Sequence, residues 1–393
     1  LFDDSTIAWM SGHFQKLLGS IAAQPDVCLD EQERKGRVMG LQDRKESKFK
    51  MLMNIKSKGV RLQKREVVRL GSLSPGQTFP LLVEPASKDV DLVEWARGKA
   101  DFLESKLFEH GAILFKGFHI SSVAEFEAFA QAVCPALKGD YGDLPREKGG
   151  KSIYKSTPYP NEKTILFHSE SSHLHSWPLK QFFCCLKKAP VGGETPIVDC
   201  RRILRLLQPE TRERFRRKKL KYVRNFTTGL DVSWQEFFRT EDKAEVEERC
   251  RQDSVSFEWK EEGGLQTSQV CPAVARHPRT GDEVFFNQIQ LHHPAFLDAE
   301  DRQAMESLFR DEDFPRNVYY GDGSPIEESV IEEIRDVYRE AAVIFEWEEG
   351  ALIVVDNMLT AHARNPYQGE RKIVVAMGEI VAVEDLQPAG EQV

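Results

Sequence analysis

The sequence predicts a mainly β protein of the α+β class, a double-stranded β-helix (jelly roll) decorated by helical insertions. Strand-like segments dominate from residue 165 onward, and they read QFFCCLKKA, TPIVD, EVFFNQIQL, GALIVVDN and RKIVVAMGEIV. Helical patterns interrupt these strands at 201–219, 233–250, 299–310 and 325–341. Many strands with helices at the start and in insertions indicate two packed sheets with peripheral helices.

The first part of the chain predicts helix rather than strand. In residues 5–22, apolar side chains recur at helical spacing. Residues 33–65 are polar and basic, and we expect a helix or a linker there. We therefore divide the chain into a helical N-terminal extension, 1–65, and a jelly-roll domain, 66–393.

The start of the jelly-roll domain predicts short elements in alternation. The segment GSLSPG at 71–76 has turn chemistry, and the following PLLVEP is expected to be a short strand. A helix is predicted over 91–109, and Gly111 ends it. A strand at 112–118 and a second helix at 121–134 follow.

The composition excludes several classes of protein. The net charge of −9 gives no reason to expect a nucleic-acid partner. No run approaches the roughly 18 apolar residues of a membrane span, and the acidic start lacks a secretory signal pattern. Seven cysteines without a CxxC pair predict neither a disulfide framework nor a cysteine zinc site, which fits a reducing cytoplasm. Because the chain does not begin with Met, we expect it to be part of a larger polypeptide.

The segment His168-Ser169-Glu170 is the first candidate for a metal site. On a strand, residues two apart point to the same face, so an imidazole and a carboxylate reach one ion. Iron(II) oxygenases use two histidines and one carboxylate on one face of the metal and keep the other face open. A single match also occurs by chance in a chain with ten histidines and 63 acidic residues, and the alternative is an exposed strand end.

Three further elements follow this segment in order: GGET at 192–195, DN at 356–357, and HAR at 362–364 with GER just beyond. With them, residues 90–385 resemble the taurine dioxygenase (TauD/TfdA-like) family. The resemblance implies a jelly roll that uses Fe(II), 2-oxoglutarate and O2, with His168, Glu170 and His362 as metal ligands. It also implies that oxidation of the keto acid to succinate and carbon dioxide is coupled to attack on an unactivated C–H bond.

The family's co-substrate site maps onto two residues. The distal carboxylate of 2-oxoglutarate needs a cation, and arginine provides a planar bidentate fork. By resemblance this is Arg371, nine residues after His362, with Lys372 as the alternative. Thr195 corresponds to the family's threonine that hydrogen-bonds the same carboxylate. The structural alternatives are a surface charge for Arg371 and a turn cap for Thr195.

The family most often has aspartate at the position of Glu170. Glutamate at this position resembles the clavaminate synthase branch and the aminoacyl hydroxylases of nonribosomal peptide synthetase pathways. The first 30 or so residues resemble the end of a condensation domain from such a synthetase. The family's substrate-binding arginine, four residues past the co-substrate arginine, is replaced by Val375 or Ala376. We therefore expect an aminoacyl substrate, tethered to a peptidyl carrier protein, and the basic run at 201–224 is a candidate docking face.

Candidate substrate-pocket residues are His173, which follows the metal motif, and Asn287 and Gln288, at the end of a predicted strand. Other outcomes remain open for the site as a whole. They are a desaturase, a hydroxylase of a free amino acid or small molecule, a zinc hydrolase, and a non-catalytic module of a synthetase.

Overall fold

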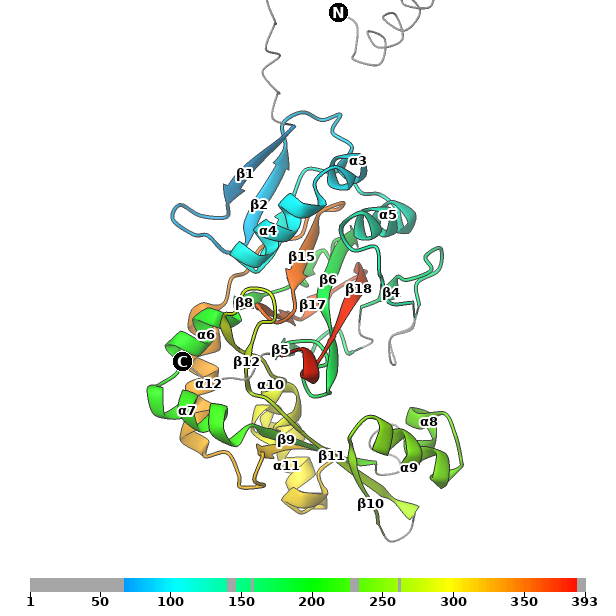
Figure 1. Cartoon of the computed structure of the whole chain (residues 1–393), viewed down its shortest axis with the longest axis vertical. Helices are drawn as coiled ribbons and strands as arrows, with labels where there is room; N and C mark the ends of the chain where they lie inside the picture. The colour runs from blue at the N-terminus through cyan, green and yellow to red at the C-terminus, as the bar shows by residue number, and fades with distance from the viewer. Residues whose placement is uncertain (1–66, 140–145, 157–158, 227–232, 261–262, 387–393) are drawn as a thin grey trace, which may run out of the picture. The chain divides into compact units, whose positions relative to one another are not determined.

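The computed structural model describes residues 67–139, 146–156, 159–226, 233–260 and 263–386 (Figure 1). The predicted N-terminal extension and its likeness to a condensation domain lie outside the described residues, and the domain boundary stays a prediction. Of the helices in the described part of the chain, none combines the length and the apolar character that a membrane span requires.

The larger sheet of the jelly roll has seven strands. In spatial order they are β1 (Val68–Ser72), β2 (Leu81–Pro85), β3 (Ala112–Phe115), β15 (Leu352–Asp356), β6 (Ser176–Lys187), β18 (Lys372–Ala382) and β4 (Tyr154–Lys155). All neighbours pair antiparallel except β2 and β3. Both faces of the central strands are covered, which explains why β6 and β15 read as continuous apolar runs.

A smaller sheet faces the larger one and closes the jelly roll. Its strands, in order, are β5 (Ile165–His168), β16 (Thr360–Arg364) and β8 (Ile197–Asp199). Ile197 of β8 packs with Ile353 and Val355 of β15 in one apolar cluster. Two short ladders extend the architecture, β17 (Tyr367–Gln368) with β7 (Val191–Gly192) and β12 (Val274–Arg276) with β13 (Glu283–Phe285). The predicted jelly roll is thus confirmed.

Three helices cover the outer face of the larger sheet. They are α3 (Leu92–Arg97), α4 (Ala100–His110) and α5 (Val123–Val133), and they pack on the outward side chains of β3, β6 and β15. The prediction of one helix over 91–109 was wrong, because Gly98 caps α3 and the chain restarts as α4. The strand predicted at 112–118 is shorter and ends at Phe115.

The remaining helices lie in the insertions: α6 (Cys200–Leu206), α7 (Pro209–Lys218), α8 (Trp234–Phe238), α9 (Lys243–Gln252), α10 (Ile289–His292), α11 (Ala299–Leu308) and α12 (Glu328–Ala341). Short 3-10 turns occupy Pro294–Phe296, Asp311–Asp313 and Val383–Asp385. The helices predicted at 201–219 and 233–250 are each two helices. Proline at the first position of α7 favours a new start there, since it lacks the N–H that a continuing helix needs.

A third sheet was not predicted. Its strands, in order, are β10 (Ser256–Trp259), β11 (Leu265–Cys271), β9 (Leu220–Phe226) and β14 (Arg316–Tyr320). We call it the insertion sheet, and Figure 1 shows it with α8 and α9 beside it. The strand predicted for EVFFNQIQL is confirmed only for Glu283–Phe285, because the chain then turns into α10.

A buried histidine–aspartate pair fixes the corner between β15 and β16. Asp356 accepts backbone hydrogen bonds from Met358 and Leu359 through Oδ1, at 2.9 and 3.0 Å. Its Oδ2 accepts from His277 Nε2 at 3.0 Å, and both side chains are fully buried. His277 Nδ1 accepts from two backbone amides of its own hairpin, so its proton must lie on Nε2.

We predict that His277→Leu lowers the free energy of unfolding by about 2–4 kcal/mol, because Asp356 and two amides lose a buried partner. Urea unfolding of the whole chain measures this change. His119→Leu, at an exposed histidine, is the matched control and should leave the midpoint unchanged. Equal midpoints for both variants would contradict the structural role given to His277.

Candidate metal centre

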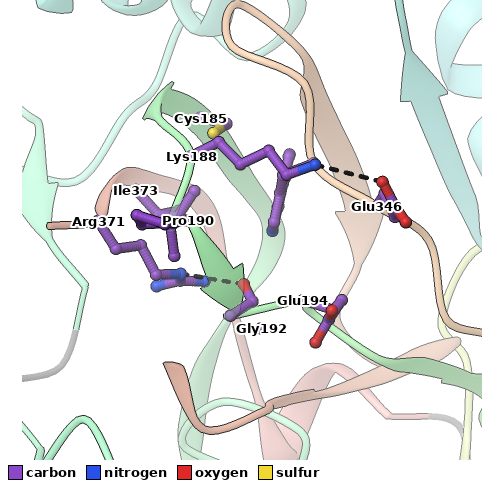
Figure 2. A pocket seen from close by; sticks show the side chains of 11 residues that line it. Cys185, Lys188, Pro190, Gly192, Glu194, Glu346, Arg371 and Ile373 are labelled. Atoms are coloured by element: carbon purple, nitrogen blue, oxygen red, sulfur yellow. Dashed lines mark hydrogen bonds and ion pairs between the residues drawn. The ribbon is translucent and has the colours of Figure 1, made fainter. Parts of the chain in front are cut away.

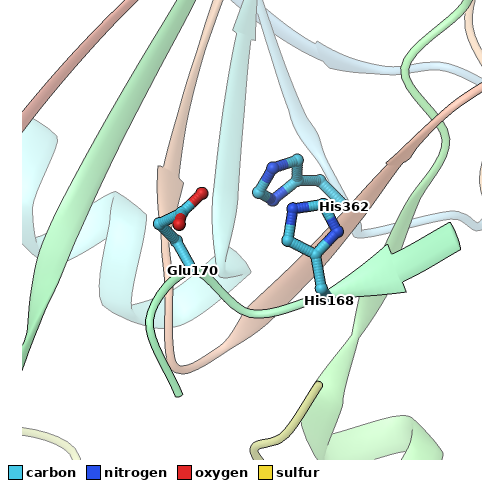
Figure 3. A group of neighbouring side chains, drawn as sticks. All are labelled: His168, Glu170 and His362. Atoms are coloured by element: carbon cyan, nitrogen blue, oxygen red, sulfur yellow. The ribbon is translucent and has the colours of Figure 1, made fainter. Parts of the chain in front are cut away.

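Two strands of the smaller sheet place two imidazoles side by side. β5 ends at His168, and β16 carries His362 directly opposite it in the antiparallel register. Side chains opposite each other on antiparallel strands project from the same face, with Cβ atoms about 4.5–5.5 Å apart. The ring centroids accordingly lie 4.3 Å apart. Figure 3 shows the carboxylate of Glu170 beside these two rings.

Glu170 reaches the histidines from a turn and not from a strand. β5 stops at His168, and Ser171 adopts a left-handed φ of 56°. The Asn357 side chain holds this turn: its Oδ1 accepts from Glu170 N at 2.7 Å, and its Nδ2 donates to Glu170 O at 2.9 Å. The same-face argument for a strand was therefore wrong in its reason. The two residues converge because an amide clamps the backbone between them.

Ligand atoms of His168, Glu170 and His362 all lie within 4.8 Å of one another. Within the described ranges, no other group of three His, Cys, Asp or Glu side chains converges in this way. His293 caps a 3-10 turn, where its Nδ1 accepts from Ala295 N.

The protonation of the two imidazoles suits a metal. His168 Nδ1 lies 2.8 Å from Leu166 O, so Nδ1 carries a proton and Nε2 is the ring nitrogen that would bind a metal. Burial, aided by His168, lowers the pKa of His362 well below its usual value, which keeps the ring neutral. Its Nδ1 is buried without a partner among the described residues. Two imidazoles and one carboxylate therefore fit the donor set of a non-haem iron(II) site.

The three side chains line one cavity together with the predicted co-substrate residues. Its described lining comprises Ser156, Ile165, His168, Glu170, Gln181, Phe183, Thr195, His362, Ala363, Arg364, Arg371, Ile373 and Val375. The structure thus brings Thr195 and Arg371 to the metal ligands, although both lie far from them in sequence. Arg364 lines this cavity too, but its NH groups donate to Tyr159 O, Pro160 O and Lys163 O.

Arg371 is held from two sides. Its Nε donates to Gly193 O at 3.0 Å, and its NH2 approaches Thr195 Oγ1 at 3.5 Å. Thr195 Oγ1 also accepts from Trp347 Nε1 at 3.0 Å, so its own O–H is left to donate. Burial, with Arg364 nearby, lowers the pKa of Arg371 to about 10, so the guanidinium stays charged at neutral pH.

The double-glycine turn makes room for this arginine. A Cβ on Gly193 would stand 3.0 Å from Arg371 Cδ and Nε, and a Cβ on Gly192 would stand 2.2 Å from Pro366 O. Arg371 also lines a second pocket (Figure 2), where Lys188 and Glu346 form an ion pair at 3.2 Å. Arg371 therefore borders both pockets.

Lys372, the alternative co-substrate cation, lines neither pocket. It forms an ion pair with Glu147 at 3.1 Å, and its side chain is 43% exposed. Successive residues of a strand point to opposite faces, so the placement of Arg371 in the cavity directs Lys372 away from it.

The predicted substrate residues separate into two groups. His173 lines a larger cavity, described below. Asn287 and Gln288 line neither that cavity nor the metal cavity as far as the described residues show. Instead they hydrogen-bond the backbone of Ser169, which lies between the ligands His168 and Glu170. Ser169 N donates to Asn287 O at 3.2 Å, and Gln288 Nε2 donates to Ser169 O at 3.0 Å. Trp177 and Phe286 pack in the core, with their ring centroids 4.9 Å apart.

The larger cavity, which we call the insertion cleft, has a volume of about 420 Å³. This lies in the range of small-molecule sites, about 300–1,000 Å³. Its lining includes His173, Tyr222, Arg224, His292 and Arg316, with aromatic rings of α8. Sequence reasoning missed all of these except His173. The available signal was the alternation of Leu220, Tyr222, Arg224 and Phe226, which has the period of a strand.

Comparisons with known proteins agree with this geometry. A model of the family described as "Taurine catabolism dioxygenase TauD, TfdA family" matches residues 77–377. Dapdiamide synthesis protein DdaC of Enterobacter agglomerans is 37% identical over 294 residues, which cover 74% of this chain and 87% of that protein. Clavaminate synthase-like protein At3g21360 of Arabidopsis thaliana is 27% identical over 321 residues, covering 76% and 93%.

Solved structures with a similar chain path include PvcB from Pseudomonas aeruginosa, with a TM-score of 0.49 and 15% identity. It covers 83% of this chain and 97% of its own. A taurine dioxygenase from Burkholderia xenovorans has a TM-score of 0.49 and 14% identity, and the covered shares are 82% and 96%.

The family match spans most of the jelly-roll domain, and the geometry of the cavity agrees with it. The chain is an enzyme whose cofactors are Fe(II), 2-oxoglutarate and O2. It belongs to the TauD/TfdA family of Fe(II)/2-oxoglutarate-dependent dioxygenases.

Proposed function

We propose that this dioxygenase hydroxylates the unactivated β-carbon of an amino acid, in the form of an aminoacyl group tethered to a carrier protein in nonribosomal peptide biosynthesis. In this proposal His168, Glu170 and His362 hold the iron, and Arg371 and Thr195 bind 2-oxoglutarate. The observation that carries it is the convergence of these five side chains on one cavity.

Each group has a defined task. Bound iron and 2-oxoglutarate supply the oxidation of a C–H bond by dioxygen. The single charge of Glu170 leaves a ferrous site with net positive charge, which favours an anionic keto acid. Arg371, charged and fixed by Gly193 O, directs its guanidinium at the far carboxylate of that acid. The Thr195 hydroxyl donates to the same carboxylate, because Trp347 already occupies its acceptor side.

The substrate class rests on the relatives and on the cavity. The relative of 37% identity is named for dapdiamide synthesis, a biosynthetic role. Val375, four residues past Arg371, lines the metal cavity and offers no cation to a small acid there. An aminoacyl thioester has no free α-carboxylate, so it fits a site without that cation.

The basic run at 201–224 contributes less to carrier docking than its composition suggests. Of its eleven Lys and Arg residues, at least five form ion pairs with acidic side chains of the described part of the chain: Arg201, Arg202, Arg214, Arg216 and Lys218. Arg224 lines the insertion cleft. Because the surrounding carboxylates offset much of this charge, the carrier proposal does not depend on the run.

We predict that His168→Ala, Glu170→Ala and His362→Ala each abolish the visible absorption band that forms when Fe(II) and 2-oxoglutarate are added to the protein without oxygen. Each variant removes one of the three donors that the ion requires. His119→Ala should leave the band intact. A full-strength band in any of the three variants would remove that residue from the ligand set.

We predict that Arg371→Met raises the apparent Kd for 2-oxoglutarate about 30-fold or more, because loss of a buried charge partner costs at least 2 kcal/mol. Lys372→Met provides a neighbouring control of equal charge change and should alter the Kd less than about twofold, since Lys372 faces Glu147. The reverse ranking of the two variants, measured by anaerobic titration, would assign the carboxylate to Lys372.

We predict that incubation of the enzyme with Fe(II), 2-oxoglutarate and oxygen adds one oxygen atom to one member of a panel of aminoacyl groups loaded on a carrier domain. Mass spectrometry of the thioester-bound group detects this gain, and the free amino acid should remain unchanged. A loss of two hydrogens would identify a desaturase, and oxidation of the free acid alone would contradict tethering.

A further inference from the structure

We propose that the side-chain carbonyl of Gln181 binds the α-nitrogen of the substrate's aminoacyl group in the metal cavity, by accepting an N–H of that nitrogen. This inference rests on the proposed function. It deepens that function by assigning one residue of the cavity to the substrate, beside those that hold the metal and the co-substrate.

The position of Gln181 in the larger sheet directs its side chain toward the metal. β6 lies between β15 and β18 (Figure 1), and Gln181 stands opposite Val355 on one side and Met377 on the other. Side chains alternate along a strand. Phe182 accordingly packs on the helix-covered face, whereas Gln181 and Phe183 line the metal cavity. A polar amide therefore projects from the sheet into this cavity.

The amide of Gln181 is engaged on one side only. Its Nε2 lies 3.7 Å from the sulfur of Met377. A thioether accepts and does not donate, so this contact keeps the NH2 group on the side of Met377 and the carbonyl oxygen on the other. Among the buried side-chain oxygens of the described residues, Gln181 Oε1 is the only one without a hydrogen-bond partner. The side chain as a whole is 1% exposed.

A buried carbonyl without a donor costs free energy, because the water that would bind it is excluded. The nearest charge along the strand does not offset this cost. Lys180, one position before Gln181, points to the opposite face and pairs with Glu104 at 3.0 Å and Glu379 at 2.6 Å. A ligand that brings an N–H to the Gln181 carbonyl would remove the cost.

Gln181 and the co-substrate arginine stand at opposite ends of the cavity. Arg371 lies just before β18, and Met377, the partner of Gln181, follows it by roughly 20 Å along an extended strand. Phe183 lies between these two ends, with its ring centroid 4.9 Å from that of the ligand His362. The metal ligand is therefore level with the middle of this row. The Arg371 end is assigned to the co-substrate, so the Gln181 end remains for the substrate.

The chemistry of the two small molecules favours a substrate nitrogen as the missing donor. Every heteroatom of 2-oxoglutarate is an acceptor at neutral pH, so the co-substrate cannot satisfy the carbonyl of Gln181. The oxygen and sulfur of an aminoacyl thioester are acceptors too, and its α-nitrogen is the N–H donor that amino acids share. Only the α-carbon separates this nitrogen from the β-carbon. A hydrogen bond to Gln181 would therefore hold the β-carbon in the cavity that contains the metal ligands.

The test measures binding of carrier-loaded probes by isothermal titration calorimetry, with the whole chain, Fe(II) and 2-oxoglutarate in the absence of oxygen. The probes are three forms of one acyl group on a carrier domain: the aminoacyl thioester, its N-acetyl derivative, and the des-amino analogue with hydrogen in place of nitrogen. The acyl group is the member of an amino acid panel that the wild-type protein binds most tightly. A slightly acidic buffer keeps the amine protonated, since α-amino groups have a pKa of about 7.7–8.0.

We expect the wild-type protein to bind the aminoacyl form about tenfold or more tightly than the des-amino form, because hydrogen bonds to charged groups contribute at least that factor. Gln181→Met keeps the length of the side chain and removes only the amide, so it should abolish this preference. Gln181→Glu should keep or raise the preference, because a carboxylate is a stronger acceptor for an ammonium group. Gln303→Met, at an exposed position of α11, is the control and should bind all three forms like wild type.

The N-acetyl form identifies the donor. If it binds like the aminoacyl form, a single amide N–H is sufficient, and if it binds like the des-amino form, the ammonium group is required; both results support the contact. The proposal is overturned if the wild-type protein does not distinguish the aminoacyl form from the des-amino form. It is also overturned if Gln181→Met weakens both forms equally and so keeps the wild-type preference, since that result assigns Gln181 a packing role.

The absorption band of the iron–2-oxoglutarate complex separates this inference from the proposed function. It should form in both Gln181 variants, because Gln181 is not one of the three metal ligands. Absence of the band in the wild-type protein would refute the metal assignment. A wild-type protein that forms the band but binds no carrier-loaded amino acid would refute the proposed substrate class, and the role of Gln181 with it.

Discussion

The corner between β15 and β16 is the constraint on which the site depends. Asp356 accepts hydrogen bonds from two backbone amides of the corner, and the buried His277 side chain donates to its other carboxylate oxygen. Its neighbour Asn357 clamps the backbone of Glu170. β16 then pairs with β5 and sets His362 opposite His168. Two adjacent polar residues thus bring His362 to two ligands that precede it by almost 200 positions in the sequence, without contributing a ligand atom themselves.

Charge is distributed along the site in a definite order. The metal ligands carry one negative charge, from Glu170. Arg371 carries a positive charge at the far wall of the same cavity. The insertion cleft is lined by side chains of a different sheet. The apolar side chain of Val375 lines the same cavity and adds no further charge there.

The sequence contained enough information for the jelly roll and for the candidate metal and co-substrate residues, because these depend on local patterns and ordered motifs. It did not separate pocket residues from packing residues, and Asn287 and Gln288 line neither cavity as far as the described residues show. Arg371 and Lys372 could not be separated, since strand parity relative to the cavity is a property of the folded sheet. The insertion sheet was missed because β9 continues a basic helical run and carries Arg224 at an inward position, which disguises its alternation. Contacts between distant segments, such as Arg316 opposite Arg224, leave no trace in local sequence.

The central claim is that one cavity holds iron through His168, Glu170 and His362 and orients 2-oxoglutarate through Arg371. Anomalous X-ray diffraction at the iron edge, on anaerobic crystals containing both, tests it most directly. We expect one iron peak within coordinating distance of all three side chains and a co-substrate carboxylate against Arg371. Iron bound elsewhere, or a co-substrate with its far carboxylate away from Arg371, would contradict the account.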